Sequence, residues 1–325
     1  MSTFGSEEVI TFLQKSDDLN IYYAGFDLNT FRYKELIEQL QRVIVDFSYG
    51  FHNGVLENSY NIDILRESAK SLYSIKEFSN VKKIYVDDES EIADDIEDKY
   101  LKRGEFGELL LHLLLRDFHN AIPLLSKIFL KDSYGHAVHG FDSVHIAPEI
   151  DNPSEYSLWF GESKLYHNGK AGVKALTKDI EEHFNADYLR AEFTLISKKK
   201  ESFISLEKFK DENKKKEYEK FLELKDKWFS VLDSKSKLDN ILSSVTIPML
   251  CTYSSDTFNK FTDETSQDFL DELYKEIAEL KKYFDDNLKI PIPKDLNIIL
   301  FLFPVPSKKE LVKQLHTKLS YMQAV

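Results

Sequence analysis

The segment WFGESK, residues 159–164, constrains the fold and chemistry of this chain more than any other stretch. It is an apolar run that carries a carboxylate, Glu162, and an ammonium, Lys164, two residues apart, and such a run predicts a β-strand. Side chains along a strand alternate between the two faces of the sheet. Glu162 and Lys164 are therefore expected on one face, and Ser163 on the other.

Three further acids precede this segment in the chain. Asp142 lies at the start of another apolar segment, and Glu105 and Glu108 lie at the beginning of a strongly apolar helix. Hard divalent ions such as Mg²⁺ prefer oxygen ligands and usually keep several waters. An acid on a helix, an Asp on one strand and a Glu-x-Lys on the next indicate a metal-dependent nuclease core. Taken alone, Glu105 and Glu108 are better explained as ordinary acids that the helix dipole favours near a helix N-terminus. The two downstream motifs shift the balance toward a role in the site.

In this order, the runs RGEFGELL (103–110), HGFD (139–142) and LWFGESK (158–164) resemble the PD-(D/E)xK nuclease superfamily. More specifically, they are similar to the HamA family, the nuclease subunit of Hachiman anti-phage systems. The resemblance is specific over about residues 100 to 190. It implies a DNA-cleaving effector that works beside a helicase subunit encoded with it. One departure from the superfamily is that Phe141, and not a proline, precedes Asp142.

We therefore expect a Mg²⁺- or Mn²⁺-dependent endonuclease that hydrolyses DNA phosphodiesters. Asp142 and Glu162 are predicted to hold the metal, with the Ser163 carbonyl as a further ligand, and one of the two helix acids to anchor metal-bound water. Lys164 is predicted to position the nucleophile or to stabilise charge on the phosphate. Two rival functions stay open. One is a catalytically inactive nuclease-fold subunit that recruits a helicase, and the other is a metal-dependent hydrolase of small phosphate esters.

Charge and cysteine content limit the class of protein further. The 325 residues carry a net charge of −13, which argues against a chain that coats nucleic acid unaided, because nonspecific affinity comes largely from phosphate neutralisation. Either the basic groups gather in one cleft or a partner delivers the substrate. The single Cys251 excludes an intrachain disulfide and a Cys-based zinc site. With no signal-peptide pattern and no membrane-spanning run, a cytoplasmic location is expected.

Residues 87–98 hold eight acids in twelve positions and are predicted to mark a domain boundary. A solvated linker is the favoured interpretation, and a phosphate mimic in the nuclease cleft or a docking strip for a basic partner is the alternative. Residues 1–90 are predicted to form a small α+β accessory or partner-docking domain, and residues 100–325 a nuclease-like domain. Within the latter, residues 104–184 carry the core motifs and residues 188–240 a helical insertion.

The hydrophobic pattern predicts an α/β fold in which helices flank both faces of a mixed sheet. Strands are expected at residues 21–26, 81–86, 124–130, 141–146, 156–164, 245–253 and 296–303, with Pro248 at a sheet edge or a bulge. Helices are expected at residues 33–47, 61–78 and 100–119, from residue 168 or 169, within 188–240, and at 267–284 and 308–322. The strands at 124–130, 141–146 and 156–164 should form a meander that brings Asp142 and Glu162 to adjacent positions.

The lysines and histidines near these motifs could either contribute to a site or serve only as surface or packing residues. Lys170, Lys174 and Lys178 lie four apart on the helix after the Glu-x-Lys strand, so they could follow a phosphate backbone. A solvated face balanced by neighbouring acids is the alternative. His136, His139 and His145 cluster around Asp142 in the sequence. His139 and His145 have the strand parity opposite to that of Asp142, and a zinc site would need matched geometry and a closing ligand. We therefore expect packing or substrate contacts, and not metal ligation, from the histidines.

Overall fold

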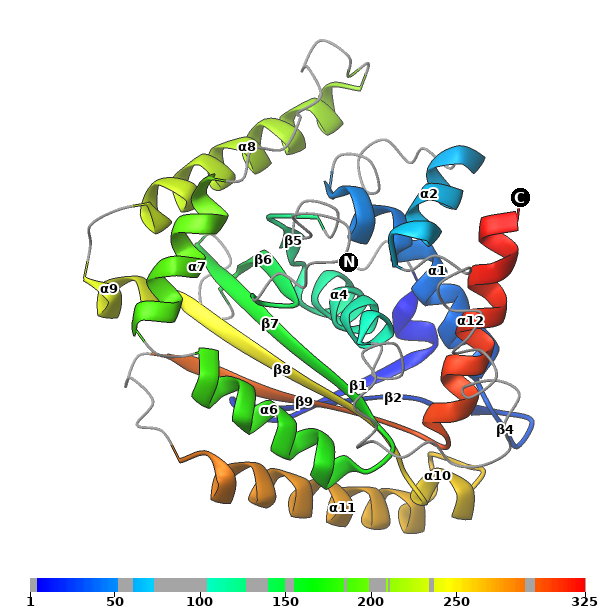
Figure 1. Cartoon of the computed structure of the whole chain (residues 1–325). Helices are drawn as coiled ribbons and strands as arrows, with labels where there is room; N and C mark the ends of the chain where they lie inside the picture. Colours follow the sequence, from blue (N-terminus) through cyan, green and yellow to red (C-terminus); the bar gives the residue numbers. More distant parts are fainter. Residues whose placement is uncertain are drawn as a thin grey trace.

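The computed structural model describes residues 5–51, 61–72, 104–126, 140–149, 155–183, 186–198, 209, 211–233, 237–289 and 296–324. These residues form a seven-stranded mixed sheet flanked by helices and a small two-stranded sheet near the N-terminus (Figure 1). The mixed α/β architecture predicted from the sequence is confirmed.

The central sheet has the strand order β1-β2-β9-β8-β7-β6-β5. Its strands are β1 (Ile10–Ser16), β2 (Leu19–Ala24), β5 (Ile122–Pro123), β6 (Ser143–Pro148), β7 (Tyr156–Tyr166), β8 (Val245–Ser254) and β9 (Asn297–Val305). Parallel pairing joins β2, β9, β8 and β7, whereas β1 at one edge and β6 and β5 at the other are antiparallel to their neighbours. Strands β8 and β9 are buried along most of their length, which explains their continuous apolar sequences.

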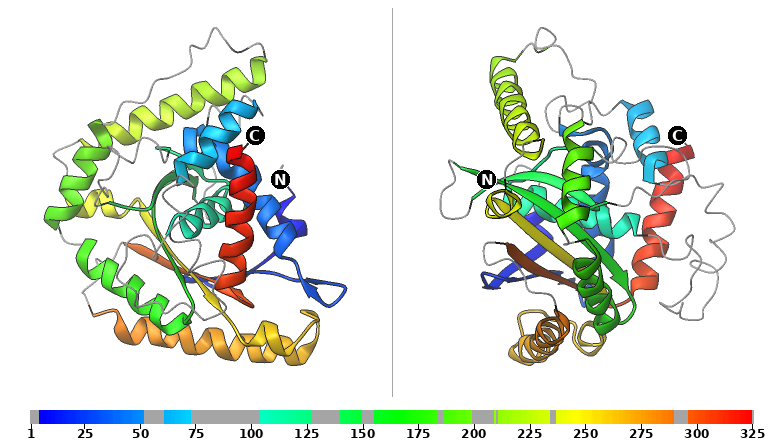
Figure 2. Two further views of the ribbon diagram at one scale, coloured as in Figure 1. Left: turned by 45° about the vertical axis from the view of Figure 1, so that its right-hand side comes forward. Right: turned by 60° about the vertical axis from the view of Figure 1, so that its left-hand side comes forward.

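Helices cover both faces of the sheet (Figures 1 and 2). One layer contains α1 (Tyr33–Tyr49), α2 (Ile62–Leu72), α4 (Glu105–His119) and α12 (Lys308–Ala324), and the other contains α6 (Gly169–His183) and α11 (Gln267–Asn287). A Cβ atom at Gly161 of β7 would lie 2.7 Å from Leu111 Cδ2 of α4, and one at Gly172 of α6 would lie 2.6 Å from Cys251 Sγ of β8. Cys251 is in register with Lys164, so these two residues lie on the same face of the sheet as α6. Gly161 is three residues before Lys164 on β7 and therefore lies on the opposite face, against α4.

The segment predicted as a helical insertion contains α7 (Ala186–Lys198), α8 (Glu212–Leu232) and α9 (Leu238–Leu242). Helix α8 packs against α7, and its buried Tyr218 and Phe221 form a small hydrophobic cluster with Phe51 and with Ile122 of β5. The remaining elements are a 3-10 turn (Ser6–Glu8), α10 (Thr257–Lys260) and the hairpin of β3 (Phe26–Asp27) and β4 (Thr30–Phe31). Among the helices in the described ranges, none is long and apolar enough to cross a membrane.

Two strand expectations are wrong. The strand expected at 124–130 is displaced, since β5 comprises Ile122–Pro123, residues 124–126 are not in a strand, and residues 127–130 lie outside the described residues. Pro248 is not at an edge, because β8 pairs with β9 on one side and β7 on the other. Its pairing with β7 is interrupted between Trp159–Thr246 and Glu162–Met249 without a change of register. The central strand thus accommodates a residue that lacks an N–H donor by leaving a gap in one ladder.

The N-terminal part of the chain contributes directly to the central sheet. Strand β1, which the sequence pattern did not predict, pairs with β2, and β2 continues the parallel order next to β9. Apolar residues of β2 and α1 share one hydrophobic core with β7, β8 and β9. The predicted domain boundary stays a prediction, because the acidic run 87–98 and the strand expected at 81–86 lie outside the described residues.

Candidate active site

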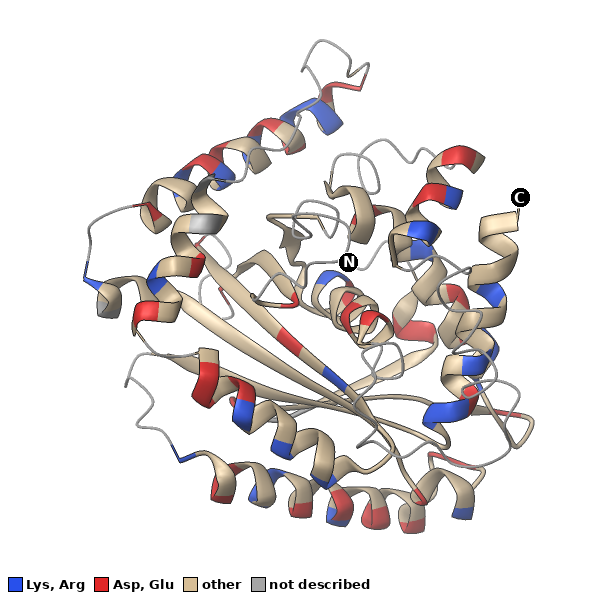
Figure 3. Ribbon diagram, in the orientation of Figure 1, with Lys and Arg blue, Asp and Glu red and all other residues tan. Residues whose placement is uncertain are grey.

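Glu162 and Lys164 are the only Asp, Glu, Lys or Arg residues in strands β5 to β9. Figure 3 shows one acidic and one basic position on β7. Both side chains reach α6, since Glu162 Oε1 lies 3.2 Å from His183 Nδ1 and Lys164 Nζ forms an ion pair with Asp179. Ser163 projects to the other face, where a Cβ on Gly107 of α4 would lie 3.3 Å from Ser163 Oγ. The alternation predicted from the sequence is therefore present.

Asp142 directly precedes β6, next to Glu162. Its chain neighbour Ser143 pairs with Gly161, the chain neighbour of Glu162, in the antiparallel pair of β6 and β7. Asp142 Oδ2 accepts hydrogen bonds from the Ser163 backbone N–H at 2.8 Å and from Ser163 Oγ at 3.0 Å. Asp142 thus contacts a side chain on the α4 face while its charge acts on Glu162, which belongs to the α6 face.

The electrostatics of Glu162 are unusual for a carboxylate. The side chain is 2% exposed, and burial, followed by the nearby Asp142 charge, raises the pKa of Glu162 to about 8. The hydrogen bond to Glu162 in turn raises the pKa of His183. Both shifts mean that the Glu162–His183 pair retains a proton at neutral pH. A bound cation next to Glu162 would replace that proton.

Lys164 is held in its charged form. Burial lowers its pKa, but the carboxylates of Asp142, Asp179 and Glu162 outweigh burial, so the pKa of Lys164 is raised. The side chain stays 24% exposed, which leaves it accessible to a ligand from solvent. Lys164 is therefore a donor and a fixed positive charge, and not a base at neutral pH.

Three contacting residues were not predicted from the sequence: Asp179, His183 and Tyr188. The Tyr188 ring on α7 stacks on His183 with centroids 4.8 Å apart and an angle of 6° between the planes. A helix that packs antiparallel on the preceding strand returns, in its last turns, to the middle of that strand. Polar residues four apart at 179 and 183, near the end of the predicted helix, are the sequence signal that points to the first two.

The α4 acids lie on the other side of β7. Glu108 is buried and Glu105 is half-buried, both in the first turn of α4. Since Gly107 packs against Ser163, α4 covers the face opposite to the Glu162 side chain. For Glu105 or Glu108 to belong to the same site as Glu162, its side chain would have to reach the site past the end of β7, on the side where Asp142 lies. Their role with metal-bound water stays a prediction.

The oxygen donors near Glu162 fit a Mg²⁺- or Mn²⁺-type ion that keeps several waters. Within the described part of the chain, no three His, Cys, Asp or Glu side chains are arranged to hold a metal. Mg²⁺, however, is commonly bound through only one or two carboxylates, with waters and substrate oxygens completing the octahedron. Asp142 and Glu162 supply such a pair, and their mutual repulsion favours a cation between them. The Ser163 carbonyl stays a predicted further ligand.

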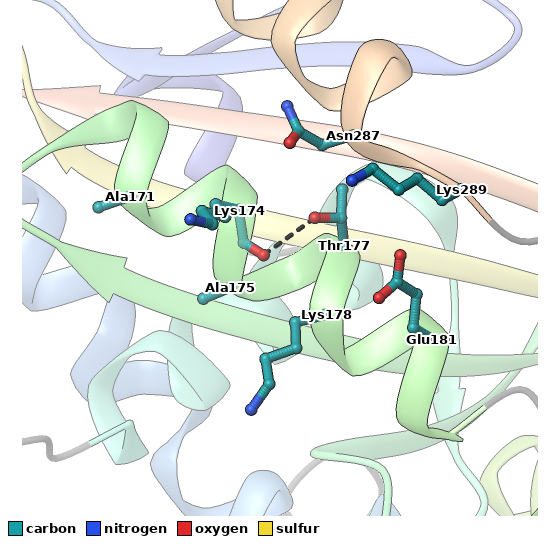
Figure 4. A pocket seen from close by; sticks show the side chains of 8 residues that line it. All are labelled: Ala171, Lys174, Ala175, Thr177, Lys178, Glu181, Asn287 and Lys289. Carbon is teal, nitrogen blue, oxygen red and sulfur yellow. Dashed lines mark hydrogen bonds between the residues drawn. The ribbon is translucent and has the colours of Figure 1, made fainter.

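The α6 lysines expected to contact nucleic acid are exposed. Lys170 lies 3.8 Å from Glu279 of α11, and Lys178 lies 3.0 Å from Glu182. Lys174 and Lys178 border a cleft of about 390 Å³ between α6 and the end of α11, where Lys289 also lies (Figure 4). Figure 4 also shows the Lys178 side chain extending away from Lys289. Their predicted role in nucleic-acid binding is untested.

His145 belongs to a separate buried cluster. Its Nε2 lies 2.8 Å from His112 Nδ1, and His112 Nε2 lies 3.1 Å from Asp46 Oδ2. Arg116 Nη1 donates to both Asp46 oxygens at 2.9 Å. This network joins α1, α4 and β6 on the face opposite to Glu162. His136 and His139 lie outside the described residues.

Fold and site together define a mixed α/β protein in which a carboxylate at the start of β6 lies beside a carboxylate and a lysine of β7. The model of the HamA family matches residues 3–319, and the chain belongs to this family. A search of curated proteins gave no match.

Proposed function

We propose that this protein is a metal-dependent endonuclease of the PD-(D/E)xK superfamily that hydrolyses DNA phosphodiesters as the effector of a Hachiman anti-phage system. The observation that carries the proposal is the convergence of Asp142, Glu162 and Lys164 at the centre of a HamA-family chain. Strongly perturbed ionisable groups that cluster around one point are typical of catalytic sites.

Each residue has a distinct task in this proposal. Asp142 and Glu162 hold Mg²⁺ or Mn²⁺, which supplies Lewis-acid activation of the phosphate and lowers the pKa of bound water. Lys164, which keeps its proton, donates to the phosphate oxygens and stabilises the negative charge that grows on them. The hydrogen bonds from Ser163 to Asp142 keep that carboxylate beside Glu162.

Plasmid nicking by the purified chain tests the proposal. Nicking should require Mg²⁺ or Mn²⁺ and should be lost in Glu162→Ala, Asp142→Ala and Lys164→Ala, while Glu217→Gln on the exposed side of α8 should cleave normally. Full activity of Glu162→Ala would refute the assignment. Rapid cleavage of a small chromogenic phosphodiester without plasmid nicking would instead favour a small-ester hydrolase.

A non-catalytic subunit is the competing candidate. It is favoured by the absence of a three-residue metal cluster from the part of the chain that the structure describes. Such a subunit would bind its partner normally and show no metal-dependent nicking with or without that partner.

A helicase partner would explain how a chain of net charge −13 reaches DNA and is restrained. Helix α8, with Lys214, Lys215 and Lys216 in its first turns, is the proposed contact surface together with the N-terminal region. Because β1 and β2 belong to the central sheet, substitution is a better test than deletion of residues 1–90. Reversal of the three lysine charges should abolish co-purification with the helicase subunit, and unchanged co-purification would place the contact elsewhere.

A further inference from the structure

Helix α6 contacts both charged residues of β7 with matching geometry. Asp179 and His183 are four residues apart on the helix, which spans about 6 Å along its axis. Glu162 and Lys164 are two residues apart on the strand, which spans about 6.6 Å. Since α6 runs back along β7, the order is reversed: Asp179 pairs with Lys164, and His183 lies 3.2 Å from Glu162. Two contacts therefore connect one helix face to one strand face. We call the His183–Glu162 contact the upper rung and the Asp179–Lys164 contact the lower rung.

The upper rung is fixed by aromatic contacts. The His183 ring stacks on Tyr188 of α7. The ring of Phe141, the residue before Asp142, lies nearly perpendicular to His183, with the two centroids 6.4 Å apart. An imidazole held between two rings has little freedom to rotate, so its Nδ1 stays directed at Glu162 Oε1. One carboxylate oxygen is thereby engaged, and the Glu162 head group is held in a single orientation.

The lower rung, the Lys164–Asp179 ion pair, differs from the Lys178–Glu182 ion pair within α6. Lys178 and Glu182 also lie four apart on α6, but their side chains are 70% and 56% exposed and face solvent. Asp179 and Lys164 are 17% and 24% exposed and connect two elements. A solvated pair contributes little to positioning, whereas a pair shielded from water holds its members in one arrangement.

We infer that Asp179 and His183 are positioning residues, through which α6 orients Lys164 and Glu162 for metal and phosphate. The inference rests on the proposed function, because it takes Glu162 as a metal-holding group. His183 holds one oxygen of Glu162 and leaves the other for the ion. Asp179 directs the Lys164 ammonium along the same face. Partners of metal-holding side chains typically account for a 10- to 100-fold difference in metal affinity.

Mn²⁺ binding to the purified full-length chain, followed by electron paramagnetic resonance, tests the upper rung without measuring activity. His183→Ala should bind Mn²⁺ roughly tenfold more weakly than wild type or worse. His183→Asn, whose amide N–H can replace Nδ1–H, should recover most of the affinity. Glu182→Gln, which changes the neighbouring position, should leave the affinity unchanged. Wild-type affinity in folded His183→Ala would overturn the inference.

Chemical acetylation, mapped by mass spectrometry, tests the lower rung. Lys164 should react slowly in the wild-type chain and several-fold faster in Asp179→Asn, while Asp179→Glu should restore protection. Lys178 serves as the internal reference and should react equally in all three proteins. Equal Lys164 reactivity in wild type and Asp179→Asn would overturn the role of Asp179.

Mn²⁺ binding by the Glu162→Gln variant tests the proposed function separately. Glu162→Gln should lose Mn²⁺ binding if Glu162 holds the ion. Retained binding in Glu162→Gln, or no binding by the wild-type chain, would refute the metal site and with it the inference. Loss in Glu162→Gln together with wild-type affinity in His183→Ala would refute the positioning role alone.

Discussion

Replacing Glu162 with Gln should make the metal-free protein more resistant to unfolding as the pH rises. The glutamine keeps the shape of the side chain and removes its charge. Burial and the Asp142 charge raise the folded-state pKa of Glu162 to about 8 from an ordinary value of 4.5. The folded chain therefore binds more protons than the unfolded chain between these two values. The stability contributed by the protonated group is complete below pH 4.5 and is lost as the pH rises through 8.

The size of the effect follows from the difference between the two pKa values. Each pKa unit corresponds to about 1.4 kcal/mol, so the full penalty is about 5 kcal/mol as an upper bound, and about 3.5 kcal/mol of it develops between pH 5 and pH 8. The pKa of His183 is raised by the same contact, so its contribution falls with pH in the same direction. The variant weakens that hydrogen bond at a cost of about 1 kcal/mol. It should therefore be no more stable than wild type at pH 5 and clearly more stable at pH 8.

Urea unfolding in EDTA at pH 5, 6, 7 and 8, followed by the fluorescence of Trp159 and Trp228, measures this difference. Glu217→Gln, an exposed glutamate on α8, is the matched control and should follow the wild-type curve at every pH. A constant difference between Glu162→Gln and wild type across this range would refute the assigned electrostatics. The same result would show that the Glu162–His183 pair retains no proton at neutral pH for a cation to replace.

Three further substitutions test the fold. Gly161→Ala should lower the free energy of unfolding by about 1–3 kcal/mol in urea titrations, because the new Cβ would lie 2.7 Å from Leu111 Cδ2, and an unchanged midpoint would contradict this packing. Leu28→Asn should raise stability by about 0.5–1 kcal/mol, since Leu28 is 91% exposed with φ 47°, and a lower melting temperature would contradict the left-handed turn. Arg116→Leu should cost about 3–5 kcal/mol by leaving the buried Asp46 carboxylate without its guanidinium, and a calorimetric change below 1 kcal/mol would contradict that pairing.

The sequence pattern was sufficient where chain-local periodicity decides the structure. The apolar runs of β8 and β9, the helix at 33–47 and the antiparallel pair of β6 and β7 could all be predicted, because burial and side-chain alternation act within each segment. Strand β1 could not be predicted, since its place depends on pairing with β2 beside β9 and its apolar residues do not alternate strictly. The central position of Pro248 likewise depends on two neighbouring strands that no local pattern specifies.

The site shows the same division. Alternation along β7 was enough to place Glu162 and Lys164 on one face and Ser163 on the other. The contacts from Asp179 and His183 depend on how α6 lies on the sheet, and the stacking of Tyr188 depends on the direction in which α7 follows it. These are properties of packed elements, and a spacing of four residues on a helix indicates only that two side chains share a face.

Two buried carboxylates on opposite faces of the sheet show why stability alone does not explain Glu162. Asp46 accepts from Arg116 with both oxygens and contacts His112, and these partners outweigh its burial so that the pKa of Asp46 is lowered. Glu162 is equally buried, but Asp142 adds repulsion and the available partners do not compensate, so its pKa is raised. The partners of Asp46 thus stabilise its negative charge, whereas those of Glu162 do not compensate for its burial and for the Asp142 charge. An acid maintained at such a cost, beside a charged lysine that solvent can reach, is expected where a cation and an anionic substrate complete the site.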